Sequence, residues 1–69
     1  MDTRALLAAF RLAVDKEIEA AKFYADLARN TDDPEMKTLF QRFANEEQLH
    51  ADEFEELYSS LKTKTQPEG

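Results

Sequence analysis

Glycine and proline are almost absent from the interior of this 69-residue chain, which has one glycine and two prolines. Pro67 and Gly69 lie at the carboxyl end, so Pro34 is the only residue of either type before it. Because glycine and proline are the strongest breaks in a helix, the sequence leaves room for one sharp turn. We place that turn at "NTDDPE", where Asp33 suits a helix N-cap and Pro34 the first helical position. The sequence therefore predicts an all-α antiparallel helical hairpin.

The turn sets the bounds of the two helices. We expect the first to cover about Arg4–Arg29, with Asp2 or Thr3 as its cap, and the second to cover about Pro34–Leu61. Residues 62–69, "KTKTQPEG", are predicted to form a flexible polar tail.

We take residues 1–69 as a single domain, because no repeat or linker is visible. A domain this short buries little surface alone and usually needs a cross-link, a metal or a partner. The absence of cysteine excludes disulfides and thiolate metal sites. A net charge of -6 argues against a nucleic-acid partner. No apolar run could span a membrane and no signal peptide is visible, so we expect a soluble, cytoplasmic protein.

Each predicted helix carries an apolar stripe at steps of three and four residues, interrupted by Glu17 in the first helix and by Glu47 and His50 in the second. Glu17 lies thirteen residues before Asn30, and Glu47 lies thirteen residues after Pro34. Both are therefore about 20 Å from the turn. We expect the three side chains, called the trio below, to meet at one level of the hairpin's interior. The full stripes are Leu7, Phe10, Val14, Glu17, Ala21, Tyr24 and Ala28, and Met36, Phe40, Phe43, Glu47, His50, Phe54, Leu57 and Leu61.

Burying unpaired carboxylates would cost several kcal/mol each, comparable with the whole stability of a small domain. No lysine or arginine lies on either stripe to compensate. Glu-x-x-His alone is a weak motif, but its coincidence with the stripes and with Glu17 favours a bound cation. Carboxylate oxygen together with imidazole nitrogen suits iron, manganese or zinc. The alternative is a polar layer that fixes the register of the helices.

The residues around the trio carry weaker signals. Tyr24 shares the face of the first-helix glutamate and could donate a hydrogen bond to a metal-bound carboxylate, or it could be an ordinary core aromatic. Glu46 could support the ligands from outside, although it is more typical of a half-exposed charge, and Glu53 more so. Leu12 and Phe23 share a separate face that could be a further subunit contact.

One chain offers two glutamates and one histidine, too few ligands for two metal ions. Two chains offer four glutamates and two histidines, the set that encloses a di-iron centre in ferritin-like bundles. We therefore predict that the hairpin completes a ferritin-like four-helix bundle by homodimerisation, with the site between the subunits. Higher oligomers stay open.

The stretches "DKEIEAAKFYADLA" and "TDDPEMKTLFQRFANEEQLHADEFEELY" resemble the metal-binding helix pair of the rubrerythrin branch of ferritin-like proteins, over residues from about 6 to 61. The resemblance implies that Glu17, seven residues before Tyr24, is a ligand, and that Glu47 and His50 are the bridging glutamate and the histidine of Glu-x-x-His. Ordinary rubrerythrins have four helices in one chain. A single helix pair is similar to the encapsulated ferritins, although the tail lacks an apolar peptide for docking into an encapsulin shell.

The resemblance implies two irons per dimer, with manganese or zinc as alternatives. We expect oxidation of Fe(II) by oxygen or peroxide, in the cytoplasm or inside an encapsulin compartment. The cysteine-bound iron domain of rubrerythrins is missing, so a rubrerythrin-like peroxide reductase, the first alternative, would need a separate electron donor. The second alternative is a non-catalytic, metal-stapled dimerisation module. A third is a hairpin excised from a longer chain.

Overall fold

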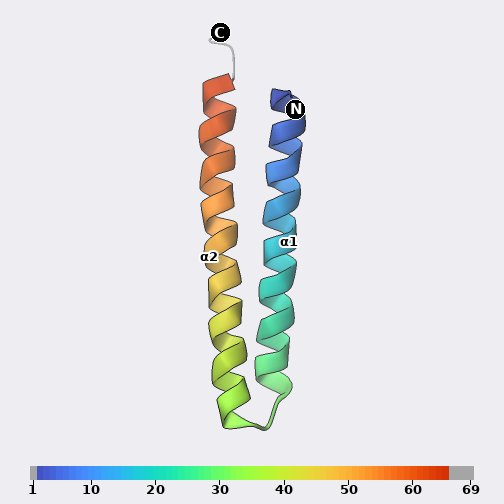
Figure 1. Cartoon of the computed structure of the whole chain (residues 1–69), viewed down its shortest axis with the longest axis vertical. Coiled ribbons are helices and arrows are strands. Elements are labelled where there is room, and N and C mark those ends of the chain that lie inside the picture. Colours follow the sequence, from blue (N-terminus) through green and yellow to red (C-terminus); the bar gives the residue numbers. More distant parts are fainter. Residues whose placement is uncertain (1, 66–69) are drawn as a thin grey trace.

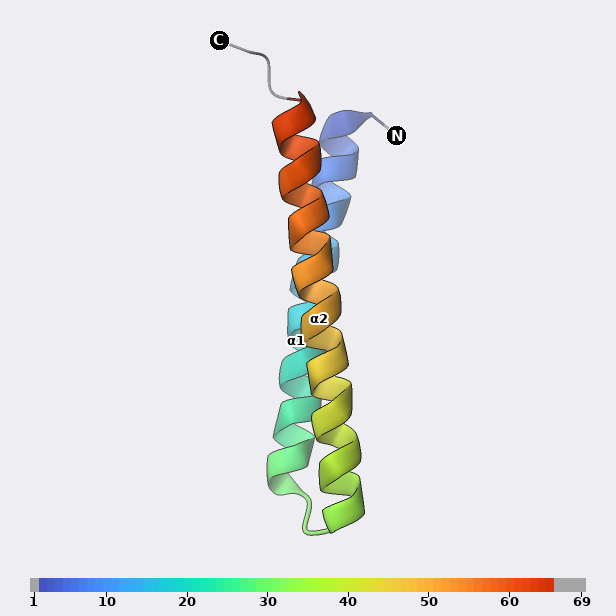
Figure 2. The same ribbon diagram turned by 90° about the vertical axis from the view of Figure 1, so that its left-hand side faces the viewer.

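The computed structural model describes residues 2–65 and consists of two antiparallel helices, α1 (Thr3–Asn30) and α2 (Pro34–Thr65). The helices lie side by side along their length, with the turn at one end and the start of α1 beside the end of α2 at the other (Figures 1 and 2). The Cα trace measures 55 × 16 × 15 Å. The predicted all-α hairpin is confirmed.

Side-chain caps define the starts of both helices. The Asp2 carboxylate accepts a hydrogen bond from the backbone N–H of Ala5 at 2.8 Å. The Asp33 carboxylate accepts hydrogen bonds from the backbone N–H groups of Glu35 and Met36 at 2.9 and 3.2 Å. These contacts satisfy amide groups that have no partner inside a first helical turn, so they stabilise the two starts that the sequence predicts.

The far side of the turn is held by a lysine. Lys37 extends its ammonium group to the backbone carbonyl of Ala28 at 2.6 Å and so caps the carboxyl end of α1, where the helix dipole favours positive charge. The end of α2 differs from the prediction, because the helix continues beyond Leu61 through Thr65. Residues 66–69 of the predicted tail lie outside the described residues.

The two helices pack through small residues. The buried hydrophobic residues are Val14, Ala21 and Ala28 on α1 and Ala44 and Ala51 on α2. Their seven-residue spacing is that of a coiled-coil seam. The predicted α1 stripe includes all three of its buried residues, but the predicted α2 stripe misses both of its own. It is displaced from the contact because its large side chains, rather than its alanines, defined the pattern.

The displaced stripe leaves large apolar side chains uncovered. No large side chain is fully buried within the described residues, and Leu57 is 52% exposed. Phe10, Phe43 and Phe54 are half-buried. A hairpin whose core is mainly alanine buries little apolar area, and since burial contributes roughly 25 cal/mol per Å², this limits the stability of a single copy. Within residues 2–65, neither helix is long and apolar enough to cross a membrane.

Candidate metal centre

The structure brings Glu17, Glu47 and His50 together midway along the hairpin. One ligand atom from each side chain lies within 4.8 Å of the others, and no other such group of three occurs in the described chain. Nδ1 of His50 is 3.5 Å from Oε2 of Glu17 and 3.5 Å from Oε1 of Glu47. The equal separation of the two glutamates from the turn explains the match in height across the helices, and the Glu-x-x-His spacing aligns the α2 pair.

The trio lies on an open face beside the helix–helix contact, and the predicted enclosure inside one hairpin is wrong. The side chains of Glu17 and Glu47 are 23% and 25% exposed, and that of His50 is 51% exposed. The physical reason is the alanine contact line. Ala44 and Ala51 turn toward α1 and rotate the trio to the edge of the interface between the helices. A single copy therefore presents the three groups on its surface, among half-buried aromatic rings.

Electrostatics couple the two carboxyl groups. A hydrogen bond shared with Glu17 raises the pKa of Glu47 above the usual value of a glutamate, and partial burial and the negative charge of Glu17 raise it further. The positive charge of His50 lowers this pKa, while the charge of Glu46 raises it slightly. Two carboxylates at one place disfavour the doubly ionised state, so one proton partly does what a bound cation would do completely.

One carboxylate oxygen lacks a partner. Oε2 of Glu17 is buried and makes no hydrogen bond within residues 2–65. Its 3.5 Å separation from the imidazole nitrogen exceeds the usual length of an N–H···O hydrogen bond. Leaving a charged acceptor unsatisfied costs more than 1 kcal/mol, about 1–3 for a neutral group. A cation would satisfy this oxygen.

The donor set fits a divalent transition-metal ion. Two ligand atoms on one such ion, at about 2.1 Å each, lie no more than about 4.3 Å apart. The observed limit of 4.8 Å requires only a small contraction, which side-chain rotation can supply. Oxygen and imidazole nitrogen donors suit iron, manganese and zinc, whereas calcium and magnesium prefer oxygen alone. The residues present therefore fit the metal that the sequence predicts, and their role as ligands stays a prediction.

Aromatic rings close the hairpin face on both sides of the trio. Toward the helix ends away from the turn, the rings of Phe10 and Phe54 lie 6.1 Å apart across the two helices. Toward the turn, Tyr24 packs edge-on against Phe43 at 5.3 Å and stacks with Phe40 at 6.5 Å. Edge-on and offset contacts of this kind stabilise aromatic pairs beyond the area that they bury. They limit access of water along the face and strengthen the charge interactions between the rings.

The neighbouring residues take the less specialised of their two predicted roles in a single copy. The Tyr24 ring is part of the aromatic cluster, and no hydrogen bond from its hydroxyl occurs within the described residues. Its contact with a ligand carboxylate stays a prediction. Glu46 lies 3.7 Å from the guanidinium of Arg42, with both side chains more than half exposed. Surface pairs of this kind contribute little to stability.

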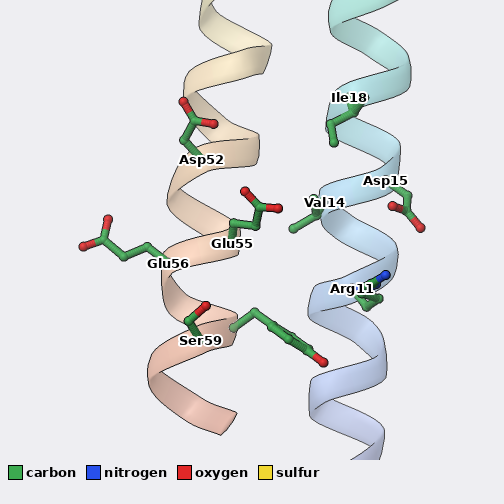
Figure 3. A pocket seen from close by; sticks show the side chains of 9 residues that line it. Arg11, Val14, Asp15, Ile18, Asp52, Glu55, Glu56 and Ser59 are labelled. Carbon is green, nitrogen blue, oxygen red and sulfur yellow. The ribbon is translucent and has the colours of Figure 1, made fainter. Parts of the chain in front are cut away.

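A larger groove of about 600 Å³ runs along the opposite side of the hairpin, lined by charged residues that include Arg11, Asp15 and Glu55 (Figure 3). Glu55 extends from α2 toward α1 in this groove (Figure 3). The groove holds none of the trio, and its acidic residues do not form a cluster with metal-ligand spacing. The cavity that does include the trio is smaller, about 230 Å³, and is lined by Glu17, His50, Glu53, Phe54 and Leu57.

Glu53 is the residue that sequence reasoning undervalued. The signal that could have identified it is its position three residues after His50, since that step places two side chains on neighbouring positions of one helix face.

Comparison with known families agrees with this geometry. The family model described as Rubrerythrin matches residues 3–68, which is nearly the whole chain. The chain belongs to the rubrerythrin family. Neither curated proteins nor solved structures gave a significant match. The two-helix hairpin fits one half of a rubrerythrin four-helix bundle, and rubrerythrins typically bind iron. Together, the family and the carboxylate–histidine group indicate a di-iron protein.

Proposed function

We propose that this rubrerythrin-family hairpin is a non-haem di-iron carboxylate protein that oxidises Fe(II) with oxygen or peroxide at a site between two copies of the chain. The observation that carries the proposal is the convergence of two carboxylates and an imidazole, with a buried oxygen of Glu17 left unpartnered on an otherwise apolar face.

The second copy is supported by the core and by the ligand count. The few buried residues are small, and the face that bears the trio also bears the half-buried Phe54 and the exposed Leu57. Covering this face would supply the apolar burial that one copy lacks. One copy also carries one Glu-x-x-His, whereas ferritin-like di-iron centres use two. Homodimerisation about a two-fold axis answers both shortages with the same surface.

Each residue of the trio has a distinct task in this proposal. Glu47 from each copy lies between the two ions, and Glu17 and His50 each complete the ligands of one ion. Negative charge from the carboxylates favours the ferric product over Fe(II). Glu47, which holds its proton more tightly than an ordinary glutamate, releases that proton when a cation arrives. The aromatic rings on either side keep bulk water from the site.

The electron balance requires two metal ions. Two Fe(II) substrate ions supply one electron each, and this pair reduces oxygen to hydrogen peroxide or hydrogen peroxide to water, with two protons taken up. Holding both ions within one dimer provides the pair without a separate one-electron step.

Anaerobic Fe(II) titration followed by oxygen tests the proposal. We expect two irons per dimer by native mass spectrometry and a rapid rise in ferric absorbance when oxygen is added. Glu47→Gln should lose the paired site, because glutamine cannot bridge two cations as a carboxylate does. Glu55→Gln, which removes the same charge from the opposite groove, is the matched control and should behave as the wild type (Figure 3).

Other outcomes separate the alternatives. Metal uptake with no oxidation by oxygen or peroxide would indicate a metal-stapled dimerisation module. Turnover only with peroxide and an added electron donor would indicate a peroxide reductase. Normal iron stoichiometry in Glu47→Gln would refute the ligand assignment.

A further inference from the structure

We propose that Glu53 is the carboxylate through which a divalent cation reaches the trio, an inference that rests on the proposed function. Glu53 would hold the ion at the margin of the site and pass it to Glu17 and His50. It would not remain a ligand in the final complex.

Glu53 connects two adjoining cavities. The first, of about 230 Å³, contains Glu17 and His50. The second, of about 290 Å³, is lined by Glu53, Glu56, Leu57 and Ser60, all of which are exposed. Glu53 and Leu57 line both cavities. Of these two shared residues only Glu53 can bind a cation, so it marks the step from the exposed cavity to the one that holds the ligands.

The first cavity offers no other stepping point. Its remaining walls are Phe54 and Leu57, whose side chains have no metal-ligating atoms. A hydrated cation that moves past an apolar wall must exchange part of its water for other oxygen donors, since losing hydration uncompensated is costly. The Glu53 carboxylate supplies those oxygens. It makes no hydrogen bond or ion pair within residues 2–65, so nothing in that range competes for it.

Position separates this role from that of a fourth permanent ligand. Glu53 does not belong to the group whose ligand atoms all lie within 4.8 Å of one another. The three-residue step places it about 60° round the helix from His50, on the side away from the buried Ala51. A second copy that covers the trio would therefore leave Glu53 near the rim of the covered face.

Stopped-flow mixing with Co(II) tests the access role without any turnover. The full chain is mixed with Co(II) at low ionic strength, and the visible absorbance of bound Co(II) is followed in the wild type, Glu53→Gln and Glu55→Gln. Charged clefts raise association rates by factors of about 10 to 1000, so the loss of one charge on the path should lower the association rate about three- to ten-fold. The final spectrum and stoichiometry of Glu53→Gln should match the wild type, and Glu55→Gln should match it in rate as well.

The rate of release distinguishes a path from a general field effect. If Glu53 lies on the path, release of Co(II) to excess EDTA also slows in Glu53→Gln, because the ion leaves the same way. A field effect alone weakens binding and leaves release equal or faster. Unslowed release, an equal loss of association rate in both variants, no loss in either, or an altered final spectrum in Glu53→Gln would each overturn the inference. Failure of the wild type to bind Co(II) would instead refute the proposed function, and the access role with it.

Discussion

The alanine contact line between α1 and α2 makes a sharp prediction about stability. Ala51 is 2% exposed, the least exposed of the buried residues, and faces α1. Ala51→Leu would place three additional carbon atoms where the helices leave no room. Overpacking of this kind costs about 1–3 kcal/mol. In a domain of this size, 1 kcal/mol lowers the Tm by about 4–8 °C, so we expect a drop of at least about 4 °C.

Thermal unfolding followed by circular dichroism measures this change. The protein is treated with EDTA and compared at a single concentration, because bound metal and self-association both raise the apparent Tm. Ala8→Leu is the matched control, since it makes the same change at an exposed position of α1 and should leave the Tm nearly unchanged. A Tm for Ala51→Leu equal to that of the control would show that the helices do not meet along the alanines.

Two further predictions concern the face that bears the trio. In metal-free protein at neutral pH, Glu47→Gln should melt at a higher temperature than the wild type, because the raised pKa of Glu47 reports a folded state that prefers the protonated form. That preference stabilises the wild type at acid pH and is lost as the pH rises through the folded-state pKa, so the difference between the two melting curves should vanish in acid; a constant difference would contradict this electrostatic origin. Leu57→Asp should weaken dimerisation at least ten-fold by sedimentation equilibrium, since covering this face would bury a charge, whereas Leu12→Asp, at a leucine that is 58% exposed on another part of α1, should not; equal effects would argue against the proposed dimer face.

Local signals in the sequence account for the secondary structure and for the height of the trio. The Asp33–Pro34 pair determines where α2 begins, through carboxylate hydrogen bonds that involve only the next three residues. Helical rise then places Glu17 and Glu47 level with each other, because each is a fixed number of residues from the same turn. Neither inference requires knowledge of how the helices pack.

The rotation of α2 about its own axis could not be predicted in the same way. Ala44 and Ala51 give almost no signal in a hydrophobic pattern, whereas Phe43 and Phe54 dominate it. A pattern reports which side chains need covering and does not report which partner covers them. The stripe on α2 therefore mixes two surfaces: alanines that meet α1 and large residues that α1 does not cover.

This division explains why charged residues are tolerated on the apolar stripe. If Glu17 and Glu47 lay in the alanine contact, their desolvation would act directly against the folding of the hairpin. On the open face they stay partly hydrated in a single copy, so one chain can fold without metal. The desolvation would arise only when a second copy covers the face, which is the event that also completes the ligand set. Metal binding and dimerisation should therefore be linked, each strengthening the other, and removal of metal by chelation should raise the Kd of the dimer. A dimer whose Kd is the same with and without metal would show that the trio lies outside the interface, and the di-iron site would then need another source of ligands.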